Sequence, residues 1–176
     1  MLRVVGGLFR GRKLDQPPLT ITRPTKDIAK EGLFNSLGNI EGLSFLDCFA
    51  GSGAMGIEAK SRGASFVAFI EKDKSAIKVL RKNIETVGLS DYKVLEGDFF
   101  KNIERLNCNF DLIFVDPPYK MVIDSDFLLK LEQNNLIGEN TRIIIERDST
   151  LNMNEFEGYS FKELKYGKSY LYILRK

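Results

Sequence analysis

Short apolar runs alternate with amphipathic stretches along most of this chain, and few folds accommodate that alternation. The apolar runs are Phe45–Cys48, Phe66–Ile70, Tyr92–Leu95, Phe110–Val115 and Arg142–Ile145, with segments of helical periodicity between most of them. Apolar strands separated by amphipathic helices are typical of parallel sheets whose two faces are both covered. The length of 176 residues suits one domain of this kind. We therefore expect an α/β domain with a doubly wound, mostly parallel sheet.

The end of the chain departs from this alternation. Tyr159–Lys165 and Tyr170–Leu174 lie on either side of Gly167 and predict an antiparallel hairpin. We assign residues 44–176 to the α/β core, with this hairpin as its last element.

The start of the chain is predicted to be an extension of the same domain and not a second domain. Arg3–Val5 and Gly11–Leu14 predict two short strands joined by a turn. Thr25 is placed to cap a helix that ends near Gly38 and whose apolar residues recur every fourth position, at Ala29, Leu33 and Leu37. Residues 1–24 form the extension that precedes this helix.

This extension is the basic part of the chain. The first 30 residues hold seven basic and two acidic side chains, a formal charge of +5, whereas the other 146 residues carry −3, and the total of +2 conceals the difference. A basic appendage on a mildly acidic body is expected to contact an anionic partner, although an ordinary solvated surface would carry the same charges.

Histidine is absent, which excludes Ser-His-Asp and Cys-His nucleophiles and the HExxH zinc motif. Cys48 and Cys108 have no CxxC partners, so we expect no metal and read each cysteine as a small buried apolar residue. No apolar run approaches the length of a membrane span, and basic residues interrupt Met1–Leu14, so we expect a cytoplasmic protein without a membrane partner.

Ligands of open α/β sheets bind beyond the carboxyl ends of strands, and the first candidate site follows the Phe45–Cys48 strand. Gly51, Gly53 and Gly56 satisfy GxGxxG between a strand and a helix. Asp47 argues against a dinucleotide, because a carboxylate at this place repels a pyrophosphate. A carboxylate instead favours S-adenosylmethionine, which is cationic at its sulfonium and its amine. A purely structural tight turn is the alternative.

The next two strands are also followed by carboxylates. Glu71, 20 residues beyond Gly51, could accept hydrogen bonds from ribose hydroxyls, or it could belong to a solvated run of charges. Asp98 could accept from an adenine amino group while Phe99 or Phe100 packs on the ring. A helix N-cap explains Asp98 almost equally well.

The third site is the sequence Asp116-Pro117-Pro118-Tyr119 after the strand Phe110–Val115. Consecutive prolines stiffen the backbone and leave carbonyls that can only accept hydrogen bonds. A carboxylate beside such a carbonyl forms a clamp for an –NH2 group, and Tyr119 can stack on a planar base. The clamp would hold a conjugated amine toward an electrophilic methyl group without any need for histidine. A proline turn with an incidental Asp and Tyr is the alternative.

Together these motifs resemble the class I S-adenosylmethionine-dependent methyltransferases that carry a D/N-P-P-Y/F motif. Over the whole chain the sequence resembles the bacterial 16S ribosomal RNA guanine-N2 methyltransferases of the RsmD type. The residues that carry this second resemblance are Arg3-Val4-Val5-Gly6-Gly7, Gly11-Arg12-Lys13-Leu14, Arg23-Pro24-Thr25, Leu33-Phe34-Asn35, Leu46-Asp47 through Glu58-Ala59, and Ser61-Arg62-Gly63-Ala64.

The resemblance implies a seven-stranded sheet with an antiparallel C-terminal strand, a short N-terminal hairpin and helix, and methyl transfer to N2 of guanine 966 in 16S ribosomal RNA. It places the methionine end of the cofactor at Asp47, Gly51 and Gly53. It places the ribose at Glu71 and the adenine at Asp98 and Phe99. Phe49 completes the predicted cofactor site.

The resemblance also assigns the substrate side of the site. Asp116, Pro117 and Tyr119 would be the catalytic residues that hold a flipped guanine, with Pro118 beside them. The extension would bind RNA phosphates through Arg10, Arg12, Lys13, Arg23 and Lys26. Lys30 stands where the family often has Arg, which puts a further phosphate contact in doubt. The expected partner is 16S RNA in the small subunit or in an assembly intermediate, bound by a monomer.

Three other functions are compatible with the residues alone. The clamp accepts any –NH2 group, so adenine N6 in DNA or RNA and the amide of a protein glutamine are alternative substrates. The chain could also be a non-catalytic RNA-binding assembly protein that keeps the fold, or a nicotinamide oxidoreductase.

Overall fold

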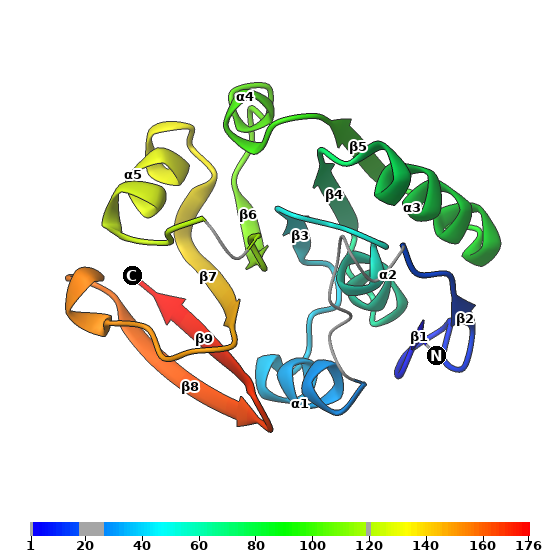
Figure 1. Ribbon diagram of the computed structural model, residues 1–176, viewed down its shortest axis with the longest axis horizontal. Helices are drawn as coiled ribbons and strands as arrows, with labels where there is room; N and C mark the ends of the chain where they lie inside the picture. Colours follow the sequence, from blue (N-terminus) through cyan, green and yellow to red (C-terminus); the bar gives the residue numbers. More distant parts are fainter. Residues whose placement is uncertain (1, 18–26, 119–120) are drawn as a thin grey trace.

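The computed structural model describes residues 2–17, 27–118 and 121–176, and a seven-stranded sheet lies at its centre (Figure 1). The strands have the order β5-β4-β3-β6-β7-β9-β8. Their bounds are β3 (Ser44–Asp47), β4 (Phe66–Glu71), β5 (Tyr92–Glu96), β6 (Phe110–Val115), β7 (Ile137–Arg147), β8 (Ser160–Tyr166) and β9 (Ser169–Arg175). β3 to β7 run parallel, and β9 is antiparallel to both of its neighbours. The predicted fold class, including the C-terminal hairpin, is confirmed.

Helices cover both faces of this sheet, as the continuous apolar strands required. Their bounds are α1 (Asp27–Leu37), α2 (Ala54–Ser61), α3 (Lys74–Val87), α4 (Phe99–Ile103) and α5 (Ser125–Gln133). α1, α2 and α3 share one core with Phe45 and Ile144, whereas α4 and α5 share a second core with Leu46 and Ile145. Neighbouring residues of one strand thus enter opposite cores, because successive side chains point to opposite faces.

The strand order has a switch point between β3 and β6, at the carboxyl ends of these strands. From β3 the chain continues to β4 and β5 on one side, and it then returns to β6 and β7 on the other. The loops after β3 and β6 therefore diverge at neighbouring strand ends. Such a switch point is where ligands bind in open α/β sheets.

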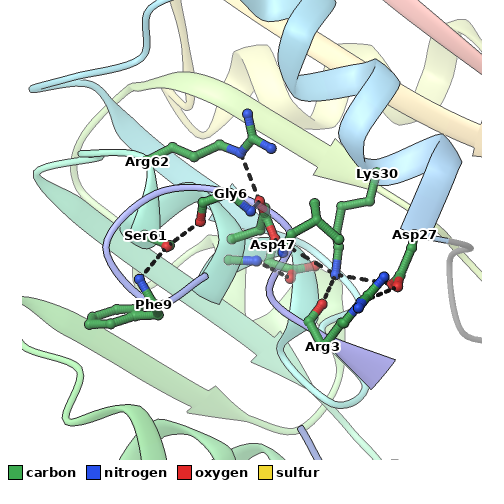
Figure 2. A network of polar contacts seen from close by, with 11 residues as sticks. Arg3, Gly6, Phe9, Asp27, Lys30, Asp47, Ser61 and Arg62 are labelled. Atoms are coloured by element: carbon green, nitrogen blue, oxygen red, sulfur yellow. Dashed lines mark hydrogen bonds and ion pairs between the residues drawn. The ribbon is translucent and has the colours of Figure 1, made fainter. Parts of the chain in front are cut away.

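The N-terminal extension is a small hairpin of β1 (Leu2–Arg3) and β2 (Lys13–Leu14) attached to α2. The Glu58 carboxylate of α2 accepts hydrogen bonds from the backbone N–H groups of Val5 and Gly6, each at 2.8 Å, and from Arg62 Nε at 2.7 Å. Figure 2 labels Gly6 and Arg62 in this network. The extension is therefore tied to the core by buried polar contacts and not by apolar packing alone.

Lys30 of α1 belongs to the same network and does not reach the surface. Its side chain is completely buried, and Nζ donates to the Arg3 carbonyl at 2.6 Å. Nζ also lies 3.7 Å from Glu58 and 4.0 Å from Asp27. Burial lowers the pKa of Lys30, while Glu58 and Asp27 oppose that change. The burial of Lys30 thus excludes the phosphate contact that the sequence left in doubt, and the side chain anchors the extension instead.

Other details differ from the sequence prediction in small ways. Cys48 is buried as expected, but Cys108 is exposed in the loop between α4 and β6. The short helix α4 was not predicted, because five residues give too little periodicity. Thr25, the predicted cap of α1, lies outside the described residues. Within the described ranges, no helix combines the length and apolar character needed to cross a membrane.

Candidate active site

A cavity of about 1040 Å³ opens at the carboxyl edge of the sheet. Five carboxylates reach its wall from or just beyond the ends of different strands: Asp47 from β3, Glu71 from β4, Asp98 after β5, Asp116 after β6 and Glu146 from β7. The first four are the carboxylates that the sequence singled out at separate strand ends. The topology brings them into one cavity.

Asp47 is buried at the base of the glycine loop. Its Oδ2 accepts from the backbone N–H of Gly56 at 3.2 Å. Burial raises the pKa of Asp47 to about 7, and the negative charge of Glu71 adds to the rise. The hydrogen bond from Gly56 lowers the pKa and only partly compensates. A buried carboxylate in this condition favours a cationic ligand that would stabilise its charged form.

Glu71 holds the glycine loop and is not part of a solvated charge run. One carboxylate oxygen accepts from Gly51 N at 2.7 Å, and the other accepts from the backbone N–H groups of Lys72 and Asp73 at 2.7 and 2.8 Å. The loop after β3 is therefore fixed against the end of β4. The predicted contact of Glu71 with a ribose stays a prediction.

The glycines of the loop serve different purposes. Gly51 lines the cavity. Gly53 has a φ of +79°, and a Cβ atom there would lie 2.3 Å from the side chain of Leu80, so it is required for the turn and for packing on α3. A Cβ atom on Gly56 would lie 2.2 Å from the ring of Phe69. Gly53 is not among the described residues that line the cavity, although it shapes the loop that does.

An aromatic group forms the wall near the end of β5. Phe49 and Phe99 both line the cavity, with ring centroids 5.0 Å apart. Asp98 also lines it and is the N-cap of α4, because its Oδ1 accepts from Phe100 N at 3.1 Å and from Lys101 N at 3.4 Å. The capping alternative for Asp98 is thus realised, and its contact with an adenine stays a prediction.

Asp116, Pro117 and Pro118 follow β6 and line the cavity. In the strand order they lie on the other side of β3 from Glu71. Asp116 is half-buried, and its pKa lies well above the ordinary value because of burial and the nearby charges of Glu146 and Asp47. The positive charge of Arg147 lowers this pKa, but its effect is smaller than that of burial and the neighbouring carboxylates. Tyr119, the last residue of the predicted clamp, lies outside the described residues.

Two features of this site were not predicted from the sequence. Glu146 lines the cavity and is 8% exposed. It directly follows the predicted strand Arg142–Ile145, so the rule that found Asp116 could have found it. In the structure β7 continues through Arg147, so Glu146 lies within the strand and not beyond its end.

The second feature is a clasp made by Asn83 of α3. Its Nδ2 donates to the carbonyls of Asp15 and Ser52 at 3.0 and 2.9 Å, and its Oδ1 accepts from Asp15 N at 2.8 Å. Asn83 is 1% exposed. Gln16 and Pro17, directly after Asp15, line the cavity. The clasp therefore makes residues 16–17 of the extension part of the cavity wall, and no local sequence signal predicts it.

The predicted RNA-binding residues lie apart from this wall. Arg10, Arg12 and Lys13 are exposed on the extension, and none of them lines the cavity. Arg12 Nη1 donates to the carbonyl of Thr86 at 3.1 Å. Arg23 and Lys26 lie outside the described residues.

The residues of the cavity fit S-adenosylmethionine. Buried and half-buried carboxylates suit its cationic sulfur and amine, and the rings of Phe49 and Phe99 suit its adenosine. In the part of the chain that the structure describes, no group of three or more acidic or cysteine side chains is arranged to hold a metal ion.

The same architecture occurs in solved methyltransferase structures. The precorrin-6y C5,15-methyltransferase of Geobacter metallireducens is 16% identical, covers 87% of this chain and 90% of its own, and has a TM-score of 0.71. The Escherichia coli protein yhhF is 30% identical over 99% of this chain and 98% of its own, with a TM-score of 0.82. The fold and the acidic cavity thus define a class I methyltransferase.

The sequence comparisons narrow this class. The family model described as "Conserved hypothetical protein 95" matches residues 2–175. Ribosomal RNA small subunit methyltransferase D of Escherichia coli K12 is 35% identical over 148 residues, which are 84% of this chain and 75% of the relative. The protein of the same name from Haemophilus influenzae is 37% identical over 84% of this chain and 79% of its own length. The chain belongs to this family of small-subunit ribosomal RNA methyltransferases.

Proposed function

We propose that the protein transfers a methyl group from S-adenosylmethionine to the exocyclic N2 of a guanine in 16S ribosomal RNA, guanine 966 by family resemblance. One observation carries the proposal. The Asp116-Pro117 acceptor pair lines the same cavity as the carboxylates and aromatic rings that fit the cofactor. Membership of the ribosomal RNA methyltransferase family supports RNA as the substrate.

The cofactor side of the cavity would consist of Asp47, Phe49, Gly51, Glu71, Asp98 and Phe99, with Gly53 shaping the loop. When bound, S-adenosylmethionine supplies an electrophilic methyl group on a positively charged sulfur. The positive charge would favour the ionised form of Asp47 and Asp116, whose pKa values are raised without a ligand. Ionised Asp116 accepts hydrogen bonds at both oxygens and donates none.

On the substrate side, Asp116 and the carbonyl of Pro117 would each accept one hydrogen of the guanine N2 amine. These two contacts turn the nitrogen toward the methyl group and stabilise positive charge as the N–C bond forms and the C–S bond breaks. The amine proton then leaves to solvent. Tyr119 would stack on the base, which must leave the helix because N2 is otherwise out of reach.

The extension, residues 1–24, would contact RNA phosphates, and residues 44–176 would carry out the chemistry. The exposed cations Arg10, Arg12 and Lys13 support this division, and Arg23 and Lys26 continue the basic segment. The substrate would be the small subunit or an assembly intermediate, bound by a monomer in the cytoplasm.

The test compares methyl transfer from labelled S-adenosylmethionine to small subunits, naked 16S RNA, DNA and a glutamine-containing protein substrate. We expect label in the subunit or its RNA, at one guanine that nuclease digestion and mass spectrometry then locate. Label in DNA or protein alone, or on adenine, would overturn the assignment in favour of another amino-methyltransferase. RNA binding without transfer would indicate an assembly protein.

A further inference from the structure

A second carboxylate lies next to the proposed amine clamp. In the register of β6 and β7, Val115 is opposite Ile145, so Asp116 and Glu146 occupy corresponding places beyond these two residues. Both line the cavity. They are close enough for the charge of Glu146 to contribute to the raised pKa of Asp116.

The strand pattern turns Glu146 toward the same side as the other acidic residues. Glu146 is two residues beyond Ile144, which is opposite Phe114 in the register of β6 and β7. Phe114 is also opposite Asp47 in the register of β3 and β6. Because side chains alternate along a strand, Glu146 and Asp47 lie on one face of the sheet. With Asp116 between them in the strand order, they form one acidic wall.

The hydrogen-bonding edge of guanine presents three N–H donors, two on N2 and one on N1. In the proposed function, Asp116 and the Pro117 carbonyl accept the two N2 hydrogens, which leaves the N1–H group. A buried donor without an acceptor is costly, so a site selective for guanine needs a third acceptor beside the clamp. Adenine presents a lone pair at N1 in the equivalent place, which a carboxylate repels.

We propose that Glu146 is the specificity-determining residue that accepts the N1–H of the target guanine, an inference that rests on the proposed function. Its place on the cavity wall beside Asp116 and its 8% exposure meet the requirement for a buried acceptor at the clamp. Asp148 also lines the cavity but is exposed, so water can replace any hydrogen bond that it makes. Three acceptors then match three donors of guanine, whereas adenine and a glutamine amide each lack the N1–H group.

The test uses substrate RNA in which 2,6-diaminopurine replaces the target guanine. This base keeps the N2 amine but carries a lone pair at N1. We expect the kcat/KM of the wild-type protein to be at least about tenfold higher for guanine RNA than for diaminopurine RNA. In Glu146→Gln the amide can accept from guanine or donate to diaminopurine, so the ratio should fall toward one. Asp148→Asn, a carboxylate-to-amide change at the exposed rim, should keep the wild-type ratio.

The ratio is informative because a general loss of folding or cofactor binding affects both bases equally. An unchanged ratio in Glu146→Gln, or a wild-type protein that does not distinguish the two bases, would overturn the role of Glu146. Should the glutamine variant fail to fold, Glu146→Ala serves the same comparison and should also lower the ratio. Absence of N2 methylation in every RNA would instead contradict the proposed function itself.

Discussion

Buried charge occurs in two regions of this protein, and the two regions neutralise it differently. At the base of the extension, Glu58 accepts from two backbone N–H groups and from Arg62, with the buried ammonium of Lys30 3.7 Å away. In the cavity, burial raises the pKa values of Asp47 and Asp116, and neighbouring carboxylates raise them further. The Gly56 N–H opposes this change at Asp47 and the charge of Arg147 opposes it at Asp116, but neither outweighs it.

The two regions therefore have different roles. The network around Glu58 holds the extension on the core, and the cavity is suited to bind a ligand. A buried ion pair with its hydrogen bonds complete holds two segments in one arrangement. Ionised carboxylates that are buried close together destabilise the ligand-free protein. A bound cation makes their ionised form favourable. Substitutions in the first region should therefore affect folding, and those in the second should affect chemistry.

The largest effect is expected from Asp116→Ala. Loss of the acceptor should lower methyl transfer by about a thousandfold or more, whereas cofactor affinity should change by less than about tenfold. Stability should not fall, because a carboxylate among like charges is removed. Single-turnover kinetics and calorimetric titration of cofactor measure the two quantities. Asp116→Asn retains one acceptor and should keep part of the activity; full activity in Asp116→Ala would refute the clamp.

Glu58→Ala should affect the opposite property. It leaves Lys30 buried without its main partner and removes the acceptor of two backbone N–H groups, so the free energy of unfolding should fall by about 3 kcal/mol. Urea unfolding measures this loss. Glu85→Ala, on the exposed face of α3, is the control and should change little. Similar losses in both variants would contradict the role of Glu58 in holding the extension on the core.

The cavity carboxylates should make stability depend on pH. The pKa of Asp47 is about 7 in the folded protein against an ordinary value of 3.8. Between these values the folded state binds more protons than the unfolded state, so stability falls as pH rises from about 4 through about 7 and then levels off. Each pKa unit corresponds to about 1.4 kcal/mol.

Thermal unfolding between pH 5 and 8 measures this dependence. Asp47→Asn should flatten it, and so should saturating S-adenosylmethionine, whose positive charge favours ionised Asp47. A cofactor-free protein whose Tm rises over this range would show that the carboxylates are not strained by burial.

The smallest effect is expected at the Asn83 clasp, which joins Asp15 of the extension to Ser52 of the glycine loop. Asn83→Ala frees Asp15 and Ser52, so cofactor affinity should fall by about tenfold as Gln16 and Pro17 lose their fixed place in the wall. Lys82→Ala is the matched control, because Lys82 forms an exposed ion pair with the side chain of the same Asp15. Equal cofactor affinities in the two variants would mean that the clasp does not shape the site.

Much of the cavity could be predicted because its members obey a local rule. Asp47, Glu71 and Asp116 each stand at or just beyond the end of an apolar run, and parallel strands bring their carboxyl ends to one edge. Glu146 directly follows the predicted strand Arg142–Ile145, so the same rule could have found it, although β7 itself continues through Arg147. Asp98 was ambiguous because capping and ligand binding require the same residue type at the same place.

The sequence alone determined the α/β alternation, the antiparallel C-terminal hairpin and the acidic strand ends, since periodicity and strand-end chemistry are local properties. Only the tertiary structure decided that Lys30 anchors the extension, that Cys108 is exposed and that Asn83 joins Asp15 to Ser52. The physical reason is that the partner of a polar group depends on which distant segments pack together. The Asp15 and Ser52 groups that Asn83 holds are 68 and 31 residues away along the chain.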